Sequence, residues 1–117
     1  MISGLSSTLS ALQAHDRKMA VNANNIANVN TNGFKRDRAV LAEGRPGDVR
    51  VTLHTDTSPA PQDPLAPDAP GVAKELSNVD LADEITGMIP TEIGYKANLK
   101  TIRTRDEMIG TLLDTLA

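Results

Sequence analysis

The feature that most constrains this chain is a pair of long apolar rows, one at each end, whose members alternate in spacing between three and four residues. This spacing is typical of helices that pack in the manner of coiled coils. It predicts helices over about residues 2–27 and 79–116, in a mainly α fold whose two terminal helices form an antiparallel coiled-coil-like pair. The first row contains Ile2, Leu5, Leu9, Leu12, Met19, Ala23 and Ile26, and the second contains Leu81, Ile85, Met88, Glu92, Tyr95, Leu99, Ile102, Asp106, Ile109, Leu113 and Leu116.

Composition supports an elongated helical protein rather than a conventional globular one. Phe34 and Tyr95 are the only aromatic residues of the 117, so the large side chains that normally fill a compact core are missing. The net charge of −3 argues against nucleic-acid binding. No apolar run approaches the roughly 20 residues of a membrane-spanning helix, and the N-terminus lacks the basic region of a cleaved signal peptide.

No arrangement of residues in the sequence suggests catalysis. Cysteine is absent, and the two histidines, His15 and His54, have no companions at metal-ligand spacing. Phosphate-binding glycine loops and nucleophile motifs are also missing. We therefore predict no enzyme activity, no cofactor, no metal and no small-molecule substrate.

The middle of the chain has a different character and divides it into segments 1–33, 34–76 and 77–117, of which the first and last form one domain. Alternating residues predict a small β-hairpin of strands 38–43 and 48–55, joined by a turn at 44–47. Five prolines between Ser58 and Gly71 favour an extended segment, which is either a linker or a docking segment for a partner. Pro90 predicts a bend or break near residues 88–91, or a helix that begins late.

The two rows do not specify which residues of the two helices face each other, or whether the helices pack against other subunits. If Ile26 lies near Glu92, then Leu12 falls near Asp106, and each acid in the rows faces an apolar neighbour. Residues 1–14 carry no charged side chain. A helix that is polar but uncharged on its outer side packs on further helices without desolvating ions. The terminal helices are therefore predicted to pack between subunits.

Two segments resemble a known family. Residues 23–36 read ANNIANVNTNGFKR, and a second segment combines SNVDL at 77–81 with Glu84, Met88, Tyr95 and Asn98. Both are similar to the terminal signatures of the flagellar axial proteins, and the short middle segment is most similar to the proximal members of the flagellar basal-body rod protein family. The sequence between Met88 and Tyr95 departs from the family pattern.

This resemblance implies a structural subunit of the proximal rod, in the periplasm-spanning part of the flagellar basal body. It implies that the chain is exported without a cleaved signal peptide by the flagellar type III apparatus, and that it polymerises with itself and other rod subunits, contributing to motility. It is expected to be neither membrane-embedded nor bound to nucleic acid. The predicted subunit interface comprises Leu5, Leu9, Leu12, Met19, Asn24, Asn25, Ile26, Asn28, Gly33, Phe34, Leu81, Ile85, Met88, Tyr95, Asn98, Leu99, Ile102, Ile109 and Leu113.

Two other functions are compatible with the pattern. One is a cytoplasmic coiled-coil adaptor or export-linked chaperone, which would remain in soluble stoichiometric complexes. The other is a membrane-surface helix at residues 1–14, although this segment lacks the Lys, Arg and Trp that such helices usually carry.

Overall fold

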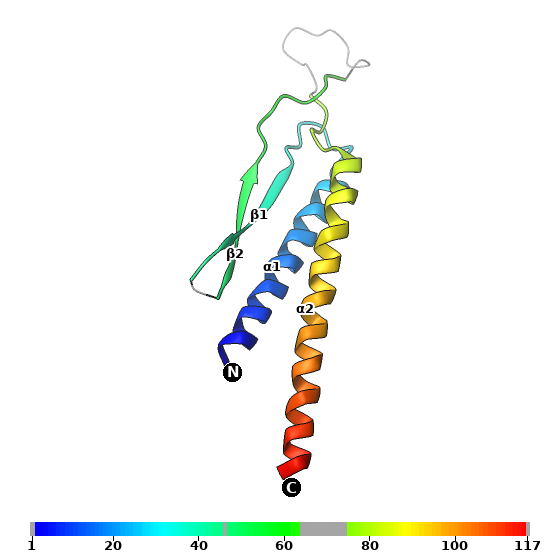
Figure 1. Cartoon of the computed structure of the whole chain (residues 1–117). Helices are drawn as coiled ribbons and strands as arrows, with labels where there is room; N and C mark the ends of the chain where they lie inside the picture. Colours follow the sequence, from blue (N-terminus) through cyan, green and yellow to red (C-terminus); the bar gives the residue numbers. More distant parts are fainter. Residues whose placement is uncertain (1, 46, 64–74, 117) are drawn as a thin grey trace.

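The computed structural model describes residues 2–45, 47–63 and 75–116. Helix α1 (Ile2–Ala27) is followed by strands β1 (Asp37–Glu43) and β2 (Val49–Thr55) and by helix α2 (Leu81–Leu116). The two helices run antiparallel and the hairpin lies against α1 (Figure 1). The molecule is elongated, with extents of 79 × 24 × 15 Å. The predicted fold class, two long terminal helices with a short β-hairpin between them, is confirmed.

Helix α1 begins and ends where the sequence predicts. After Ala27 the chain leaves the helix through a series of tight turns, in which the backbone N–H of Asn28 donates to the carbonyls of Asn24 and Asn25, both at 3.1 Å. Gly33 then adopts a φ of 71°, a left-handed conformation that glycine takes without steric cost. The Asn-rich segment therefore reverses the chain from α1 into the hairpin.

Helix α2 begins with a side-chain cap from Asp80. The carboxylate of Asp80 accepts hydrogen bonds from the backbone N–H groups of Ala82 at 2.8 Å and Asp83 at 3.3 Å. An N-terminal cap of this kind satisfies amide groups that have no partner within the helix. Asp83 and Glu84 add negative charge in the first turn, where the helix dipole favours it.

The predicted break at Pro90 is wrong, because α2 is continuous through this residue and begins well before it. Proline removes one backbone donor, which in a regular helix would bind the carbonyl of Thr86. Both Thr86 and Pro90 are exposed, so that carbonyl is within reach of water. The lost hydrogen bond therefore falls on the solvent side of α2, where it is least costly.

The two helices face each other in a register that differs from the one expected from the sequence. Gly94 lies against the ring of His15, Gly87 lies beside the amide of Asn22, and Gly4 lies against the guanidinium of Arg105. Residue numbers of facing positions therefore sum to about 109. The expected pairing of Ile26 with Glu92 is wrong by about two and a half helical turns, and Glu92 is exposed.

Small and polar side chains, rather than the apolar rows, occupy the line of contact between the helices. A β-carbon added at Gly94 would lie 2.7 Å from a His15 ring carbon, so the backbones approach closely there. Buried polar residues outnumber buried apolar ones in the described part of the chain. The buried apolar residues are Leu12, Ala14 and Ala60, and the buried polar ones are Asn22, Asn25, Ser77, Glu84 and Thr91.

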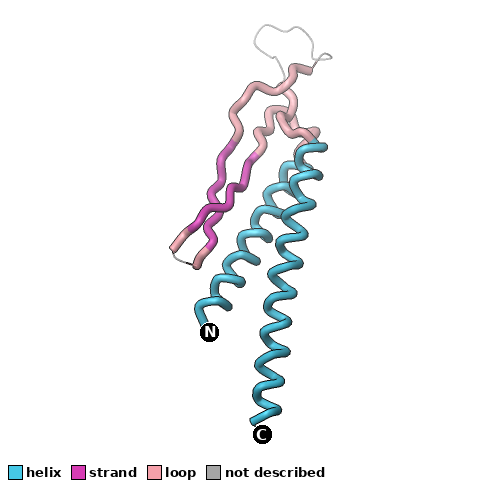
Figure 2. Tube along the Cα trace, viewed as in Figure 1, coloured by secondary structure: helices cyan, strands magenta, loops and turns pink. Residues whose placement is uncertain are grey.

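The hairpin has the predicted strands to within one residue, and its two strands pair antiparallel with Leu41 opposite Val51 (Figure 2). Ala39, Leu41, Val49 and Val51 are less exposed than the residues that alternate with them, which places them on the face toward α1. An isolated two-stranded hairpin is marginal in water, so its contact with α1 stabilises it. The predicted Pro-rich insert lies outside the described residues from position 64 onward.

Candidate assembly interface

A buried asparagine joins the end of α1 to the start of the hairpin. Asn25 has 1 % of its surface exposed, and its side-chain amide donates to the Asp37 carbonyl at 2.7 Å while its amide oxygen accepts from the Asp37 N–H at 3.0 Å. The side chain thus pairs with β1 as a neighbouring strand would. Both polar groups of Asp37 on that side are satisfied inside the chain.

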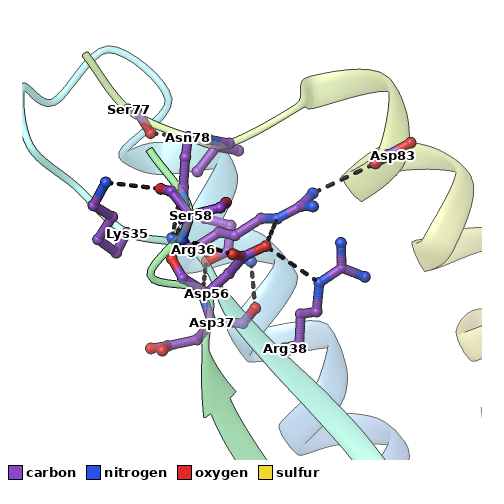
Figure 3. Close-up of polar contacts among 11 residues, drawn as sticks. Lys35, Arg36, Asp37, Arg38, Asp56, Ser58, Ser77, Asn78 and Asp83 are labelled. Carbon is purple, nitrogen blue, oxygen red and sulfur yellow. Dashed lines mark hydrogen bonds and ion pairs between the residues drawn. The ribbon is translucent and has the colours of Figure 1, made fainter. Parts of the chain in front are cut away.

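A second asparagine, from the segment before α2, links the residue before β1 to the residue after β2 (Figure 3). Asn78 accepts from the Arg36 N–H at 2.7 Å and donates to the carbonyl of Asp56 at 2.8 Å. Its own backbone N–H donates to Phe34 at 3.2 Å. The two segments that carried the family resemblance therefore meet at one place, which we call the polar junction: Asn25, Arg36, Asp37, Asp56, Asn78 and Asp83.

Charged groups reinforce the polar junction. Arg36 forms ion pairs with Asp56 at 3.1 Å and with Asp83 of α2 at 3.4 Å (Figure 3). Hydrogen bonds from Ser58 and then from Arg36 lower the pKa of Asp56 to about 2, so this carboxylate stays ionised at neutral pH. The junction links β1, β2 and the first turn of α2 through one guanidinium.

Beside the junction, a further ion pair joins the segment before β1 to residue 75. Lys35 binds Glu75 at 2.6 Å, and Glu75 also accepts from the backbone N–H of Ala60 at 2.7 Å. The hydrogen bond from Lys35, followed by that from Ala60, lowers the pKa of Glu75.

The predicted interface residues outside the two apolar rows lie near the junction or make local contacts. The Asn28 amide donates to Asn24, and the Asn98 amide donates to the Gly94 carbonyl one turn earlier in α2. Phe34 is half-buried, whereas Asn24 and Gly33 are exposed. The almost complete burial of Asn25 leaves very little of it for a neighbouring subunit to contact.

The predicted apolar interface residues are mostly exposed. Leu12 is the one that is buried. Five are half-buried, namely Met19, Ile26, Met88, Tyr95 and Ile102. Seven are 43–64 % exposed, namely Leu5, Leu9, Leu81, Ile85, Leu99, Ile109 and Leu113.

The apolar rows of the two helices lie on the same side of the pair. Successive residues of an α-helix are about 100° apart around its axis. On α1, Leu5, Leu9 and Leu12 are rotated about 60–120° from His15, which faces α2. On α2, Met88, Tyr95 and Leu99 are rotated about 100–140° in the same sense from Gly94, which faces α1. Because the helices are antiparallel, equal senses of rotation bring both rows to one side.

This side of the pair, which we call the apolar flank, is directed away from the hairpin. Ser7, Ser10 and Asn25, which contact the hairpin or its turn, are rotated about 80–140° from His15 in the opposite sense. The apolar flank consists of Leu5, Leu9 and Leu12 on α1 and Leu81, Ile85, Met88, Tyr95, Leu99 and Ile102 on α2.

Beyond the start of α1, helix α2 continues without a partner. Because Gly4 faces Arg105 and α1 begins at Ile2, the residues of α2 from about 108 onward extend past the start of α1, as the lower part of Figure 1 shows. Four large apolar side chains of this overhang, Met108, Ile109, Leu112 and Leu113, are 50–64 % exposed, and Leu116 is 85 % exposed. At 100° per residue, Met108, Leu112 and Leu116 lie within about 40° of the direction of Gly94 and continue the line along which α2 contacts α1. Ile109 and Leu113 are rotated about 60–100° toward the apolar flank. An exposed apolar stripe of this kind marks an interaction site.

Three of these exposed residues, Met108, Leu112 and Leu116, were not among the predicted interface residues. Their signal in the sequence is a spacing of four residues between one and the next. Met108 and Leu112 lie next to Ile109 and Leu113, which belong to the predicted apolar row. The glycines that bring the helices together were also missed. Their signal is the seven-residue spacing of Gly87 and Gly94 with Thr91 between them.

Within the described residues, no helix is both long enough and apolar enough to cross a membrane. The same part of the chain contains no group of three or more His, Cys, Asp or Glu residues arranged to hold a metal ion.

Comparisons with known proteins place both ends of the chain in one family. The profile "Flagella basal body rod protein" matches residues 5–35, and "Flagellar basal body rod FlgEFG protein C-terminal" matches residues 73–115. The flagellar basal-body rod protein FlgC of Buchnera aphidicola is 30 % identical, over 86 % of each chain. The chain belongs to the flagellar basal-body rod protein family.

Other relatives match over shorter stretches. The flagellar hook protein FlgE of Treponema pallidum is 54 % identical over 33 % of this chain, and the rod protein FlgG of Bacillus subtilis is 48 % identical over 34 %. The matched region is 8 % of the FlgE protein and 15 % of the FlgG protein. Likeness to FlgC therefore extends through the middle of the chain, whereas likeness to FlgE and FlgG is confined to about a third of it.

Proposed function

We propose that this protein is a structural subunit of the proximal rod, which polymerises through the apolar flank and the overhang of α2. The observation that carries the proposal is the position of the apolar rows. They extend over both helices but are largely exposed, while the contact between the helices is made by small and polar groups. A soluble chain that kept this surface uncovered would be prone to aggregation, so the surface is best explained as one that other subunits cover.

The shape of the interface fits packing by helices. The flank presents Leu, Ile, Met and Tyr side chains on two adjacent helices, and the overhang offers one helix without a neighbour. A helix of another subunit laid on this surface would bury apolar area at roughly 25 cal/mol per Å². The partners are therefore the terminal helices of further rod subunits, of this chain or of related ones.

The position in the cell follows from the family. We propose that the chain reaches the periplasm-spanning rod through the flagellar type III apparatus, and that its role is structural and not catalytic. Likeness to FlgC over most of both chains supports the proximal position.

Mass spectrometry of purified basal bodies is the direct test. Several copies of the chain in each rod are expected. If the chain is absent from intact basal bodies but abundant in soluble cytoplasmic complexes, the rod proposal is wrong and the adaptor function replaces it.

A pair of substitutions tests the interface itself. Leu99→Asp places a charge on the apolar flank and is expected to abolish rod assembly while the protein is still exported. Thr104→Asp places the same charge on an exposed position of α2 about 80° to the other side of Gly94. This control is expected to assemble, and normal rods from the Leu99→Asp variant would contradict the proposed interface.

A further inference from the structure

The outer edge of strand β2 carries backbone groups without partners. In an antiparallel pair, the N–H and C=O of alternate residues point toward the other strand and away from it. Val49 donates to Ser10 of α1 at 3.1 Å, and Asp37, opposite Thr55, exchanges hydrogen bonds with Asn25. Odd-numbered residues of both strands therefore direct their backbone groups outward.

On β2 this leaves Val51, Leu53 and Thr55 with outward backbone groups and, among the described residues, no hydrogen-bond partner for them. In Figure 1 the upper part of β2 lies on the far side of β1 from the helices. Leu53 at the centre of this edge is 45 % exposed. An open edge with no Lys or Pro among these three residues is a template for another strand.

We propose that β2 of a second copy of this chain occupies this edge, antiparallel, with Leu53 on the two-fold axis. This register sets Leu53 against its counterpart and Val51 against the second copy's Thr55. Each such pair exchanges backbone hydrogen bonds, and all three outward residues are used. The result is a four-stranded sheet with β1 at each outer edge, and sheets of three or more strands are more stable than an isolated hairpin.

The side chains on the other face of β2 favour a copy of this chain over an unrelated strand. In this register Thr52 lies opposite the second copy's His54, and Arg50 lies opposite its Asp56. Arg50 is exposed and has no ion pair among the described residues. Like charges do not face each other anywhere along the pairing.

A two-fold contact closes on itself and cannot propagate into a tube. The paired form is therefore a state of the unassembled subunit, in which one edge is protected from aggregation before assembly. The strand pairing itself is argued without the apolar flank or the overhang, whereas its role before assembly rests on the proposed rod function.

Introduced cysteines test this register directly, because the protein contains no cysteine of its own. Thr52 and the second copy's His54 form a pair without mutual hydrogen bonds, whose Cα atoms lie about 4.5 Å apart, within the range that a disulfide spans. A mixture of the Thr52→Cys and His54→Cys variants, oxidised with copper–phenanthroline, is expected to give a cross-linked dimer. Either variant alone is expected to give much less.

A matched control uses β1. Val40 is opposite Thr52 within one chain and shares its face of the hairpin, but it lies one strand further from the second copy. A mixture of Val40→Cys and His54→Cys is therefore expected to cross-link between chains no more than either variant alone. Equal cross-linking in both mixtures, or none in the Thr52 and His54 mixture, would overturn the proposal.

Sedimentation of the unmodified chain supplies the second measurement. A dimer at micromolar concentration is expected, which Leu53→Lys converts to a monomer and Val40→Lys, at an exposed position of β1, does not. Circular dichroism checks that the variants keep their helices. A wild-type chain that remains monomeric at these concentrations, or a dimer that Leu99→Asp abolishes and Leu53→Lys does not, rejects the paired edge and leaves the rod proposal untouched.

Discussion

The two ends of the helix pair use their side chains in opposite ways. At the end near the hairpin, polar groups are buried and bonded within the chain: Asn25 is 1 % exposed and Arg36 binds carboxylates from two segments. At the other end, α2 extends alone with Leu116 85 % exposed. The first end fixes the internal arrangement of the subunit, and the second presents apolar area to something outside it.

This contrast explains how a chain with few buried apolar residues adopts a defined structure. Hydrogen bonds to buried polar groups contribute about 1 kcal/mol each, but leaving such a group unpaired costs more. The polar junction therefore specifies the position of the hairpin more than it stabilises the fold. Under the proposed function, apolar burial, which drives most folding and association, is left largely for assembly. Substitutions at the two ends should accordingly have different consequences for the isolated chain.

The largest expected effect is at the polar junction. Asn25→Ala leaves the N–H and C=O of Asp37 without partners in a buried site, and we expect it to lower the free energy of unfolding by about 2–3 kcal/mol. Denaturant unfolding followed by circular dichroism measures this. The neighbouring Asn24→Ala, at an exposed position, should cost less than about 0.5 kcal/mol. Equal effects at the two positions would show that the junction does not fix the hairpin.

Glycines along α2 should respond according to their distance from α1. Gly94→Ala places a β-carbon 2.7 Å from the His15 ring, which must move, so we expect a loss of about 1 kcal/mol despite the better helix propensity of alanine. Gly110→Ala, in the overhang with nothing within 4 Å, should gain about 0.5–1 kcal/mol. A stabilising Gly94→Ala substitution would mean that the helices are further apart than described.

Acid should weaken the junction through Asp56. Its pKa is lowered from 3.8 to about 2, so the stability that it contributes is complete above about pH 5 and is lost as the pH falls toward 2. The melting temperature of the wild-type chain should therefore fall between pH 5 and pH 2.5. Asp56→Asn should be less stable than the wild type at pH 5 and should show a smaller fall over this range. An identical fall in both proteins would exclude Asp56 as a source of the acid sensitivity.

The smallest effect on the isolated chain should come from the overhang. Leu113→Asp changes a side chain of the overhang that is 64 % exposed, so the free energy of unfolding should change by less than about 0.5 kcal/mol. Rod assembly in cells, scored by swimming and by electron microscopy of basal bodies, should nevertheless be lost. Normal assembly would restrict the interface to the apolar flank.

The sequence by itself determined the elements of this protein. The bounds of α1 and of the two hairpin strands depend on local signals, namely spacing and turn residues, which act within a few positions along the chain. Family membership was also visible in the residues around Asn25 and Asn78. These predictions held because the relevant interactions are short-range.

Only the tertiary structure decided which face of each helix lies inside. The apolar row and the row of Gly87, Thr91 and Gly94 both repeat at spacings that suit helix packing. The small residues form the contact because they allow close approach, and Asn22 reaches the Glu84 carbonyl at 3.2 Å across it. Similarly, Pro90 is tolerated because its missing hydrogen bond falls on the exposed side of α2. These outcomes depend on which surfaces meet, and a periodic pattern does not specify that.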